Sequence, residues 1–205
     1  MPASRTLAYA AVRLALLRSV VAVLALVAAV AGALAPVHAQ AVDPAVRYMD
    51  MVAQELIAAS RTRSAATLQS VIVRHADLAY MGGQGLGDFS NQLSSTEKPA
   101  FLSGMARWMA RFATSEADKY PISHVTFQPS ARAARLGLMV DSTIHMRDGA
   151  SYDVAWLLAR NGTSYKVRDA QILTFWMTGQ LNRLFSSYIS ENGGQARALV
   201  IALNR

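Results

Sequence analysis

The spacing of apolar residues changes from a helical period to a strand period in the second half of this chain, and this change constrains the fold most. Up to Pro121 the apolar residues recur every three or four positions, whereas from Leu136 they alternate with polar residues. Asp148-Gly149 and Asn161-Gly162 divide the alternating stretch, and both dipeptides favour two-residue hairpin turns. The chain is therefore predicted to be α+β, with helices that cover one face of an antiparallel sheet.

The alternating stretch predicts a curved, four-stranded antiparallel meander. Its strands are expected at 122–128, at 136–146, at 152–158 and around Tyr165 and Val167. Side chains two positions apart share one face of a strand. The inward face is therefore predicted to hold Leu136, Leu138, Val140, Ile144, Met146, Tyr152, Val154, Trp156, Leu158, Tyr165 and Val167.

Helices are predicted on both sides of this sheet in the sequence. The first begins at Asp43-Pro44 and ends near Ser60, because Asp is a good N-cap and Pro suits the first helical position. Further helices are expected at 64–80, from a cap at Thr96, at 176–190 and at 195–203. The third helix carries a wide apolar stripe, formed by Phe101, Met105, Trp108, Met109 and Phe112.

The glycine-rich residues 82–90 resemble a nucleotide-binding loop only superficially. A dinucleotide-binding loop follows a strand, whereas this segment follows a predicted helix, and it lacks the Gly-Lys-Ser/Thr of a phosphate-binding loop. Gly82-Gly83 is expected to stop the second helix, and residues 82–90 to form a flexible connection to the third.

The amino terminus has the three parts of a secretory signal peptide in order. Arg5, Arg13 and Arg18 are followed by an apolar run over 19–35, and then by small residues that suit cleavage after Ala39. Residues 1–39 are therefore predicted to be a cleaved signal peptide, and residues 40–205 one domain. An uncleaved anchor helix is the alternative, since the apolar run counted from residue 14 reaches the roughly 20 residues that span a bilayer.

Charge and cysteine content narrow the function of the exported domain. Removing three arginines and no acid with the leader lowers the net charge from +7 to +4, and the remaining Lys and Arg form no dense run. This predicts no nucleic-acid partner, but suits anionic lipid head groups or acidic partners. The chain has no cysteine, so its stability must come from packing rather than disulfides.

No motif for catalysis or for metal binding is found. His75, His124 and His145 do not have metal-ligand spacing, and the chain contains no nucleophile elbow. No catalytic residue, metal or cofactor is therefore predicted. The alternative is an acid–base site built from Asp141, Asp153 and Asp169, which lie on neighbouring predicted strands.

Large, soft apolar side chains are abundant, with nine methionines and three tryptophans in 205 residues. Methionine adapts its shape and is favoured where a surface accepts variable apolar ligands. An ordinary core and a ligand-binding interior are both compatible with this composition.

Three passages and the end of the last long helix resemble the MlaC family, also called the toluene-tolerance family. Phe185 follows the third passage by 16 residues, as a phenylalanine does in the family, and Glu191-Asn192-Gly193-Gly194 fits the family's helix end. Departures occur at Thr174-Phe175-Trp176, where the family has Gly-Val-Ser, and at Leu181-Asn182. The three passages are Leu86-Gly87-Asp88-Phe89 with Leu93, Ala117-Asp118-Lys119-Tyr120, and Tyr165-Lys166-Val167-Arg168-Asp169.

The resemblance implies a fold like the nuclear-transport-factor cone, with a curved sheet wrapped on helices around an apolar pocket. It further implies a periplasmic phospholipid carrier that contributes to outer-membrane lipid asymmetry in Gram-negative bacteria. Its implied partners are a phospholipid, an outer-membrane lipoprotein complex and an inner-membrane ABC transporter complex. The alternatives are an isomerase or dehydratase on the same fold, an adaptor that binds only proteins, and a carrier of another lipid such as a hopanoid.

The predicted lipid-binding residues combine the stripe of the third helix, the inward strand residues and the last long helix. The stripe is expected to face the sheet across the pocket, and the last helix to close it. These residues are Phe101, Met105, Met109, Phe112, Val140, Tyr152, Val154, Trp156, Tyr165, Phe185 and Tyr188.

Overall fold

The computed structural model describes residues 42–205, so the predicted leader and its cleavage site lie outside the described residues. Helix α2, Pro44–Arg61, begins where the sequence predicts. The Asp43 side chain accepts a hydrogen bond from the Ala45 backbone N–H at 2.8 Å, which satisfies one of the free donors of the first turn. Within residues 42–205, no helix combines the length and hydrophobicity that a membrane crossing requires.

The predicted helix at 64–80 is in fact two helices, α3 (Ala65–His75) and α4 (Leu78–Leu86). Ala76 between them is extended, with ψ 145°, and forms a parallel bridge with Val167. The Asp77 backbone N–H donates to the Val167 carbonyl at 2.8 Å, while the Asp77 side chain caps α4. The sheet therefore takes the backbone groups that a continuous helix would use.

The prediction of a flexible segment at 82–90 is wrong. Helix α4 runs through Gly82 and Gly83, and a 3-10 helix, η1 (Gly87–Gln92), follows it. A Cβ atom at Gly82 would lie 2.6 Å from Leu102 Cδ2, so the glycine permits close approach of the next long helix. Neither glycine stops the helix, and Gly82 is a packing residue, whereas nothing lies within 4 Å of a Cβ atom at Gly83.

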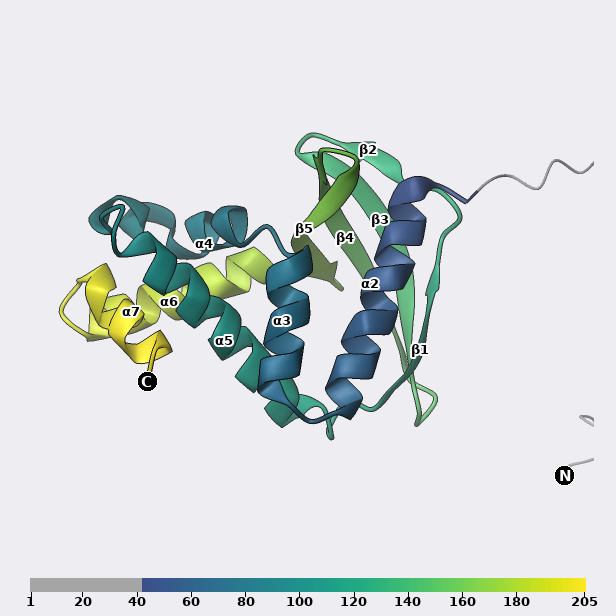
Figure 1. Ribbon diagram of the computed structural model, residues 1–205, viewed down its shortest axis with the longest axis horizontal. Helices are drawn as coiled ribbons and strands as arrows, with labels where there is room; N and C mark the ends of the chain where they lie inside the picture. Colours follow the sequence, from purple (N-terminus) through teal and green to yellow (C-terminus); the bar gives the residue numbers. More distant parts are fainter. Residues whose placement is uncertain (1–41) are drawn as a thin grey trace, which may run out of the picture. The chain divides into compact units, whose positions relative to one another are not determined.

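The remaining helices gather beside α4 (Figure 1). They are α5 (Lys98–Glu116), α6 (Met177–Glu191) and α7 (Ala196–Leu203). Glu97, rather than the predicted Thr96, precedes α5, and its carboxylate accepts a hydrogen bond from the Ser94 backbone N–H at 3.1 Å. Buried side chains of α4, α5, α6 and α7 form one apolar cluster, centred on Phe101, Met105 and Phe185.

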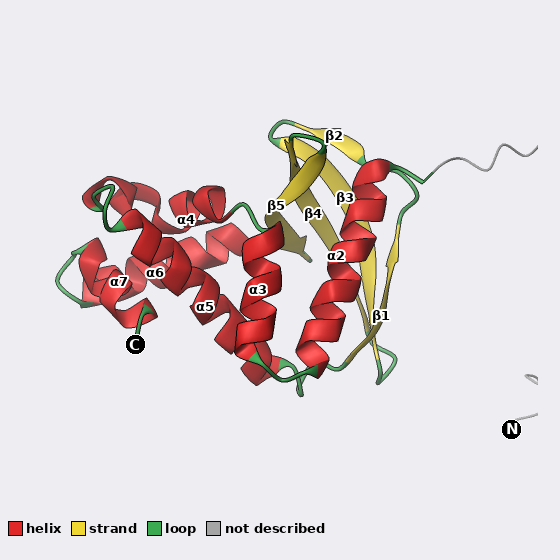
Figure 2. Ribbon diagram, in the orientation of Figure 1, coloured by secondary structure: helices red, strands yellow, loops and turns green. Residues whose placement is uncertain are grey.

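The sheet confirms the α+β class and follows the predicted meander (Figure 2), but its strand count is higher. The predicted first strand becomes β1 (Ile122–Phe127), and the additional short β2 (Arg132–Ala134) pairs with the same neighbour, β3 (Gly137–Met146). β4 (Ser151–Asn161), β5 (Ser164–Ile172) and the short β6 (Phe175–Trp176) follow in order.

Both predicted hairpin turns occur at their glycines, but with different loops. Gly149 (φ +90°) lies in a four-residue connection, closed by the Met146 backbone N–H donating to the Ala150 carbonyl at 2.8 Å. In the second hairpin Asn161 pairs with Ser164, so the two-residue loop is Gly162-Thr163. Glycine at the first loop position, with φ +60°, matches the type II′ hairpin turn.

Strand register places the predicted inward residues of β3, β4 and β5 on one face of the sheet, whereas Leu136 lies in the turn before β3 and is exposed. Val140 lies opposite Trp156, and Ile144 opposite Tyr152. Helix α2 covers part of this face (Figure 1), where Val46 and Met49 pack with sheet residues in a second apolar cluster. Met139 and Leu157, which pair on the opposite face, are buried as well, so that face is partly covered too.

Candidate functional site

An open cavity of about 670 Å³ lies where the ends of α2 and α5 meet α3 and the sheet. This volume is within the roughly 300–1,000 Å³ of small-molecule sites. Its apolar wall comes from five separate elements: α2, α3, α5, β1 and β5. The cavity is lined by Leu56, Ile57, Ser60, Arg61, Arg63, Leu68, Ala113, Glu116, Ala117, Asp118, Tyr120, Pro121, Ile122, Arg147 and Ile172.

The sequence of α5 explains why this space is left open. Met105 and Met109 fill the interior side of the helix, but the next positions at a spacing of four are Ala113 and Ala117. Residues four apart share one face of a helix, so the bulky stripe gives way to two methyl groups at the carboxyl end. Ala113 and Ala117 both line the cavity.

The cavity lining contains three arginines and two carboxylates, a net charge of +1. Arg63 pairs with Asp118 at 2.9 Å, and Glu116 pairs with Lys119 at 2.9 Å. The other two lining arginines, Arg61 and Arg147, form no ion pair with any residue of 42–205. The cavity thus combines an apolar wall with two cationic groups that are free to bind an anion.

Five predicted lipid-binding residues on the helices belong to the cluster of α4–α7 or pack against it. Phe101, Met105 and Phe185 are buried there, and Met109 and Tyr188 are partly buried against them. The rings of Phe101 and Phe185 meet edge to face at 6.0 Å.

Phe112, the sixth predicted helical residue, is 56% exposed, and its ring stacks on Trp108 at 5.7 Å. It therefore belongs to the surface of α5 rather than to the interior.

The five predicted strand residues lie elsewhere, on the inner face of the sheet. Val140 and Tyr165 are buried beneath α2, and the Trp156 indole N–H donates to Ser142 Oγ at 2.9 Å. Val154 is buried and Tyr152 is exposed.

The stripe of α5 and the inner face of the sheet thus contribute to two different clusters, because α2 rather than α5 covers Val140. None of the eleven predicted residues lines the 670 Å³ cavity. Val154 comes nearest in register, because it pairs with the cavity residue Ile172. Contact of the eleven residues with a lipid stays a prediction.

The arginines of the cavity were not among the site residues predicted from the sequence. Two signals were present: the change from methionine to alanine along α5, and Arg61 and Arg63 at the end of the apolar stripe of α2. Arg147 begins the connection between β3 and β4, and only the fold brings it to the same place.

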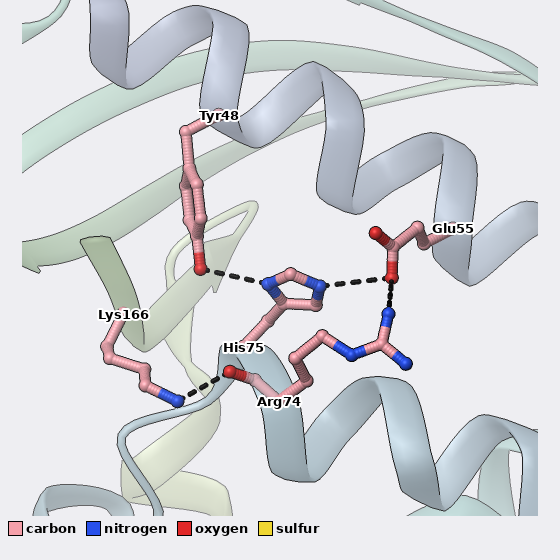
Figure 3. A network of polar contacts seen from close by, with 5 residues as sticks. All are labelled: Tyr48, Glu55, Arg74, His75 and Lys166. Atoms are coloured by element: carbon pink, nitrogen blue, oxygen red, sulfur yellow. Dashed lines mark hydrogen bonds and ion pairs between the residues drawn. The ribbon is translucent and has the colours of Figure 1, made fainter. Parts of the chain in front are cut away.

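A network of polar contacts joins α2, α3 and β5 (Figure 3). The Tyr48 hydroxyl lies 3.0 Å from His75 Nδ1, and His75 Nε2 lies 3.1 Å from Glu55 Oε2. Arg74 also donates to Glu55, at 2.7 Å, while Lys166 donates to the Arg74 carbonyl at 2.5 Å. Since a carboxylate only accepts, Nε2 carries a proton and Nδ1 of a neutral ring accepts from Tyr48. Burial, followed by the charge of Glu55, raises the pKa of Tyr48.

The three aspartates of the predicted alternative do not come together as one group. Asp169 is buried at the start of α6, where it accepts from the Thr178 backbone N–H at 3.0 Å and the Thr178 hydroxyl at 2.5 Å. Asp141 and Asp153 line a separate hollow of about 320 Å³, formed largely by polar sheet residues.

Asp141 and Asp153 each have a partner of their own in that hollow. Asp141 is held by Arg132 at 2.9 and 3.2 Å, and Asp153 accepts from Thr143 at 2.8 Å. Each of the two carboxylates therefore has a hydrogen-bond partner within the sheet.

The histidines of the sheet form no metal site with the residues around them. His124 and His145 stack with ring centroids 4.4 Å apart, and His145 contacts the hydroxyls of Thr126 and Ser151. Residues 42–205 hold no group of three His, Cys, Asp or Glu side chains arranged to bind a metal ion.

The fold and the cavity define an α+β domain in which helices cover one face of an antiparallel sheet and leave an apolar hollow beside it. Comparison with known families identifies it further. The family model described as MlaC protein matches residues 47–204, so the chain belongs to the MlaC family.

A solved structure shares this fold. It is the phospholipid-binding protein from Ralstonia solanacearum in complex with a phospholipid, with a TM-score of 0.64 and 19% sequence identity. The alignment covers 78% of this chain and 94% of that one. A comparison with curated proteins finds no match.

Proposed function

We propose that this protein is a periplasmic phospholipid carrier that moves lipid between an outer-membrane lipoprotein complex and an inner-membrane ABC transporter complex. The observation that carries the proposal is the apolar cavity with two arginines that form no ion pair within residues 42–205. Membership of the MlaC family supports it, as does the shared fold with a protein described as phospholipid-binding.

The cavity supplies what an aqueous carrier needs. Exposing acyl chains to water costs about 0.8 kcal/mol per methylene, so two chains of about 16 carbons cost roughly 20–25 kcal/mol. Lipid therefore crosses an aqueous compartment only inside an apolar host. The wall of Leu56, Ile57 and Ile172 offers such a surface to an acyl chain.

The charges suggest how the ligand is oriented. Arg61 and Arg147 lack carboxylate partners within the described chain, and a guanidinium binds phosphate through two parallel hydrogen bonds. The acyl chains thus lie along the apolar wall, and the phosphate lies beside these arginines with its head group toward solvent.

Transport in this form requires no chemistry in the domain itself. Asp141, Asp153 and Asp169 each have a hydrogen-bond or ion-pair partner in the fold, so binding rather than catalysis is the proposed activity. Free shuttling requires the leader to be removed, with cleavage after Ala39, because an uncleaved anchor would hold the protein at one membrane.

Mass spectrometry of lipid extracts tests the proposal. The full-length chain is expressed in a Gram-negative host, purified from the periplasm and characterised by amino-terminal sequencing. A mature terminus at Gln40 and near-stoichiometric phospholipid are expected. Phospholipid no more abundant than in an unrelated exported protein purified in parallel would overturn the proposal, and a different lipid in the extract would overturn its phospholipid class.

A further inference from the structure

The hairpin that joins β5 to β6 exposes four large apolar side chains within five residues. Ile172, Leu173, Phe175 and Trp176 are all exposed, and Leu173 is the most exposed of them at 67%. Soluble proteins scatter exposed apolar residues singly, whereas a contiguous group marks an interaction site. We name residues 172–176 the apolar hairpin.

The backbone of the apolar hairpin carries a second sign of function. Leu173 has φ +56°, a left-handed conformation that disfavours a branched apolar side chain. Only Arg63 shares this property among the non-glycine residues of 42–205, and Arg63 lines the cavity. Strained positions of this kind gather at binding sites, where the surrounding structure holds them.

The surrounding structure holds the hairpin firmly. Gln171 pairs with Trp176, and Ile172 pairs with Phe175. At its base, the buried Asp169 binds the backbone and the hydroxyl of Thr178 in the first turn of α6. The apolar side chains are therefore presented to solvent by a fixed support.

The hairpin borders the cavity. Ile172 belongs both to the hairpin and to the cavity wall, which Arg61 and Arg147 also line. No Asp or Glu occurs from residue 170 to residue 190, and the nearby carboxylates that share a hollow with Leu173 are Asp141, which is paired with Arg132, and Asp153. The apolar hairpin, the two arginines and the cavity wall are thus parts of one region.

We propose that the apolar hairpin inserts into the surface of a phospholipid bilayer that contains anionic lipid, and so places the cavity against the membrane. Trp and Phe are favoured at the membrane–water interface, and Arg adds attraction to anionic head groups. A stable protein interface needs roughly 800 Å² from each partner, far more than four side chains supply. A bilayer needs only this small wedge, and weak insertion leaves the protein free to depart.

Vesicle co-sedimentation tests this docking surface. The protein is produced from the full-length gene and used in the form the cell yields, so that all variants share one amino terminus. Vesicles of phosphatidylethanolamine with phosphatidylglycerol are compared with vesicles of phosphatidylcholine alone. The wild type is expected to sediment with the anionic vesicles, and less so at high salt.

Leu173→Asn/Phe175→Asn is the test variant, because asparagine tolerates the left-handed conformation at 173. It is expected to bind anionic vesicles at least about tenfold more weakly, because it lacks two apolar side chains that would insert into the bilayer. Val73→Gln/Ile201→Gln removes similarly exposed side chains from α3 and α7 and is expected to bind as the wild type does. Circular dichroism confirms that each variant is folded.

Wild-type protein that stays in the supernatant, or a test variant that sediments normally, would overturn membrane docking. A test variant with normal vesicle binding and lost binding to a protein partner would assign the hairpin to protein docking instead. Lipid extracts separate this inference from the carrier proposal: bound phospholipid without vesicle binding overturns only the docking surface.

Discussion

At the scale of single residues, Asp169 shows how a carboxylate that could be read as catalytic is used in the fold. It is buried, and it accepts hydrogen bonds from Thr178 in the first turn of α6, where the helix dipole also favours negative charge. Its position beside the apolar hairpin makes it a support for that surface.

Asp169→Ala is therefore expected to lower the free energy of unfolding by about 3 kcal/mol, because it leaves buried donors without an acceptor. Urea denaturation measures this change. Asp153→Ala, at an exposed carboxylate on β4, is expected to change the same quantity by about 0.5 kcal/mol or less. Equal effects of the two substitutions would contradict the structural role of Asp169.

The raised pKa of Tyr48 predicts how stability depends on pH. Its pKa lies above the ordinary value of 10.0 in the folded protein, so the fold favours the neutral phenol. The stabilisation is complete below about pH 10, and it is lost as the pH rises through the folded-state pKa. Denaturation at several alkaline pH values is expected to show a smaller loss of stability for Tyr48→Phe than for the wild type.

Tyr120→Phe, at an exposed tyrosine, serves as the control and is expected to lose stability as the wild type does. Identical alkaline profiles for Tyr48→Phe and the wild type would show that Tyr48 does not titrate with folding. Below pH 10, Tyr48→Phe is expected to cost about 1 kcal/mol, because His75 Nδ1 loses its donor.

At the scale of elements, α4 shows that glycines can serve close packing within a helix. Gly82 faces Leu102 and Phe101 of α5, whereas nothing lies within 4 Å of a Cβ atom at Gly83. Two adjacent residues of one helix thus have opposite environments.

Gly82→Ala is expected to lower the free energy of unfolding by about 1–3 kcal/mol, because the added methyl group overpacks the interface with α5. Gly83→Ala is expected to raise it by about 0.5–1 kcal/mol, since alanine loses less backbone entropy in a helix. Thermal unfolding of both variants compares them directly. Stabilisation by Gly82→Ala would show that α4 and α5 do not pack as closely as described.

Local patterns predicted most elements of this fold. Asp43 and Pro44 are sufficient to place the start of α2, and the period-two alternation placed β3 and β4, because these signals act over a few neighbouring residues. The break at Ala76 could not be predicted in this way, since it depends on a backbone bond to Val167, far along the chain.

The cavity was harder to predict than the strands for the same reason. Periodicity identifies inward side chains, but which inward faces meet is decided by the path of the whole chain. Helix α2 covers Val140, whereas the sequence predicted that α5 would face this residue. The 670 Å³ cavity consequently lies at the carboxyl end of α5, next to Ala113 and Ala117.

At the scale of the whole molecule, the cavity, the two arginines and the apolar hairpin lie together as three parts of one candidate binding region. In our proposals, the apolar cavity accepts acyl chains, Arg61 and Arg147 bind the phosphate, and the apolar hairpin contacts the membrane; the cavity lining and the exposure of the hairpin support them. Each part can be removed separately, so the binding of lipid and the docking to a bilayer can be measured independently.

Arg61→Gln/Arg147→Gln is expected to weaken phospholipid binding by about tenfold, because two phosphate contacts are lost. Binding of a fluorescent phospholipid to delipidated protein measures the change. Arg107→Gln/Arg183→Gln, two arginines away from the cavity lining, is the matched control and is expected to bind normally. Equal phospholipid binding by both double variants would contradict the proposal that Arg61 and Arg147 contact the phosphate.

The phospholipid occupancy of a variant whose cavity is filled tests whether this cavity holds the lipid. Ala113→Phe places a ring in the cavity, while Ala66→Phe adds the same ring to an exposed position of α3 outside it. Lipid extracts are measured by mass spectrometry per mole of folded protein. A severalfold loss of phospholipid is expected from Ala113→Phe, and wild-type occupancy from Ala66→Phe. Full occupancy of Ala113→Phe would contradict the claim that this cavity holds the lipid.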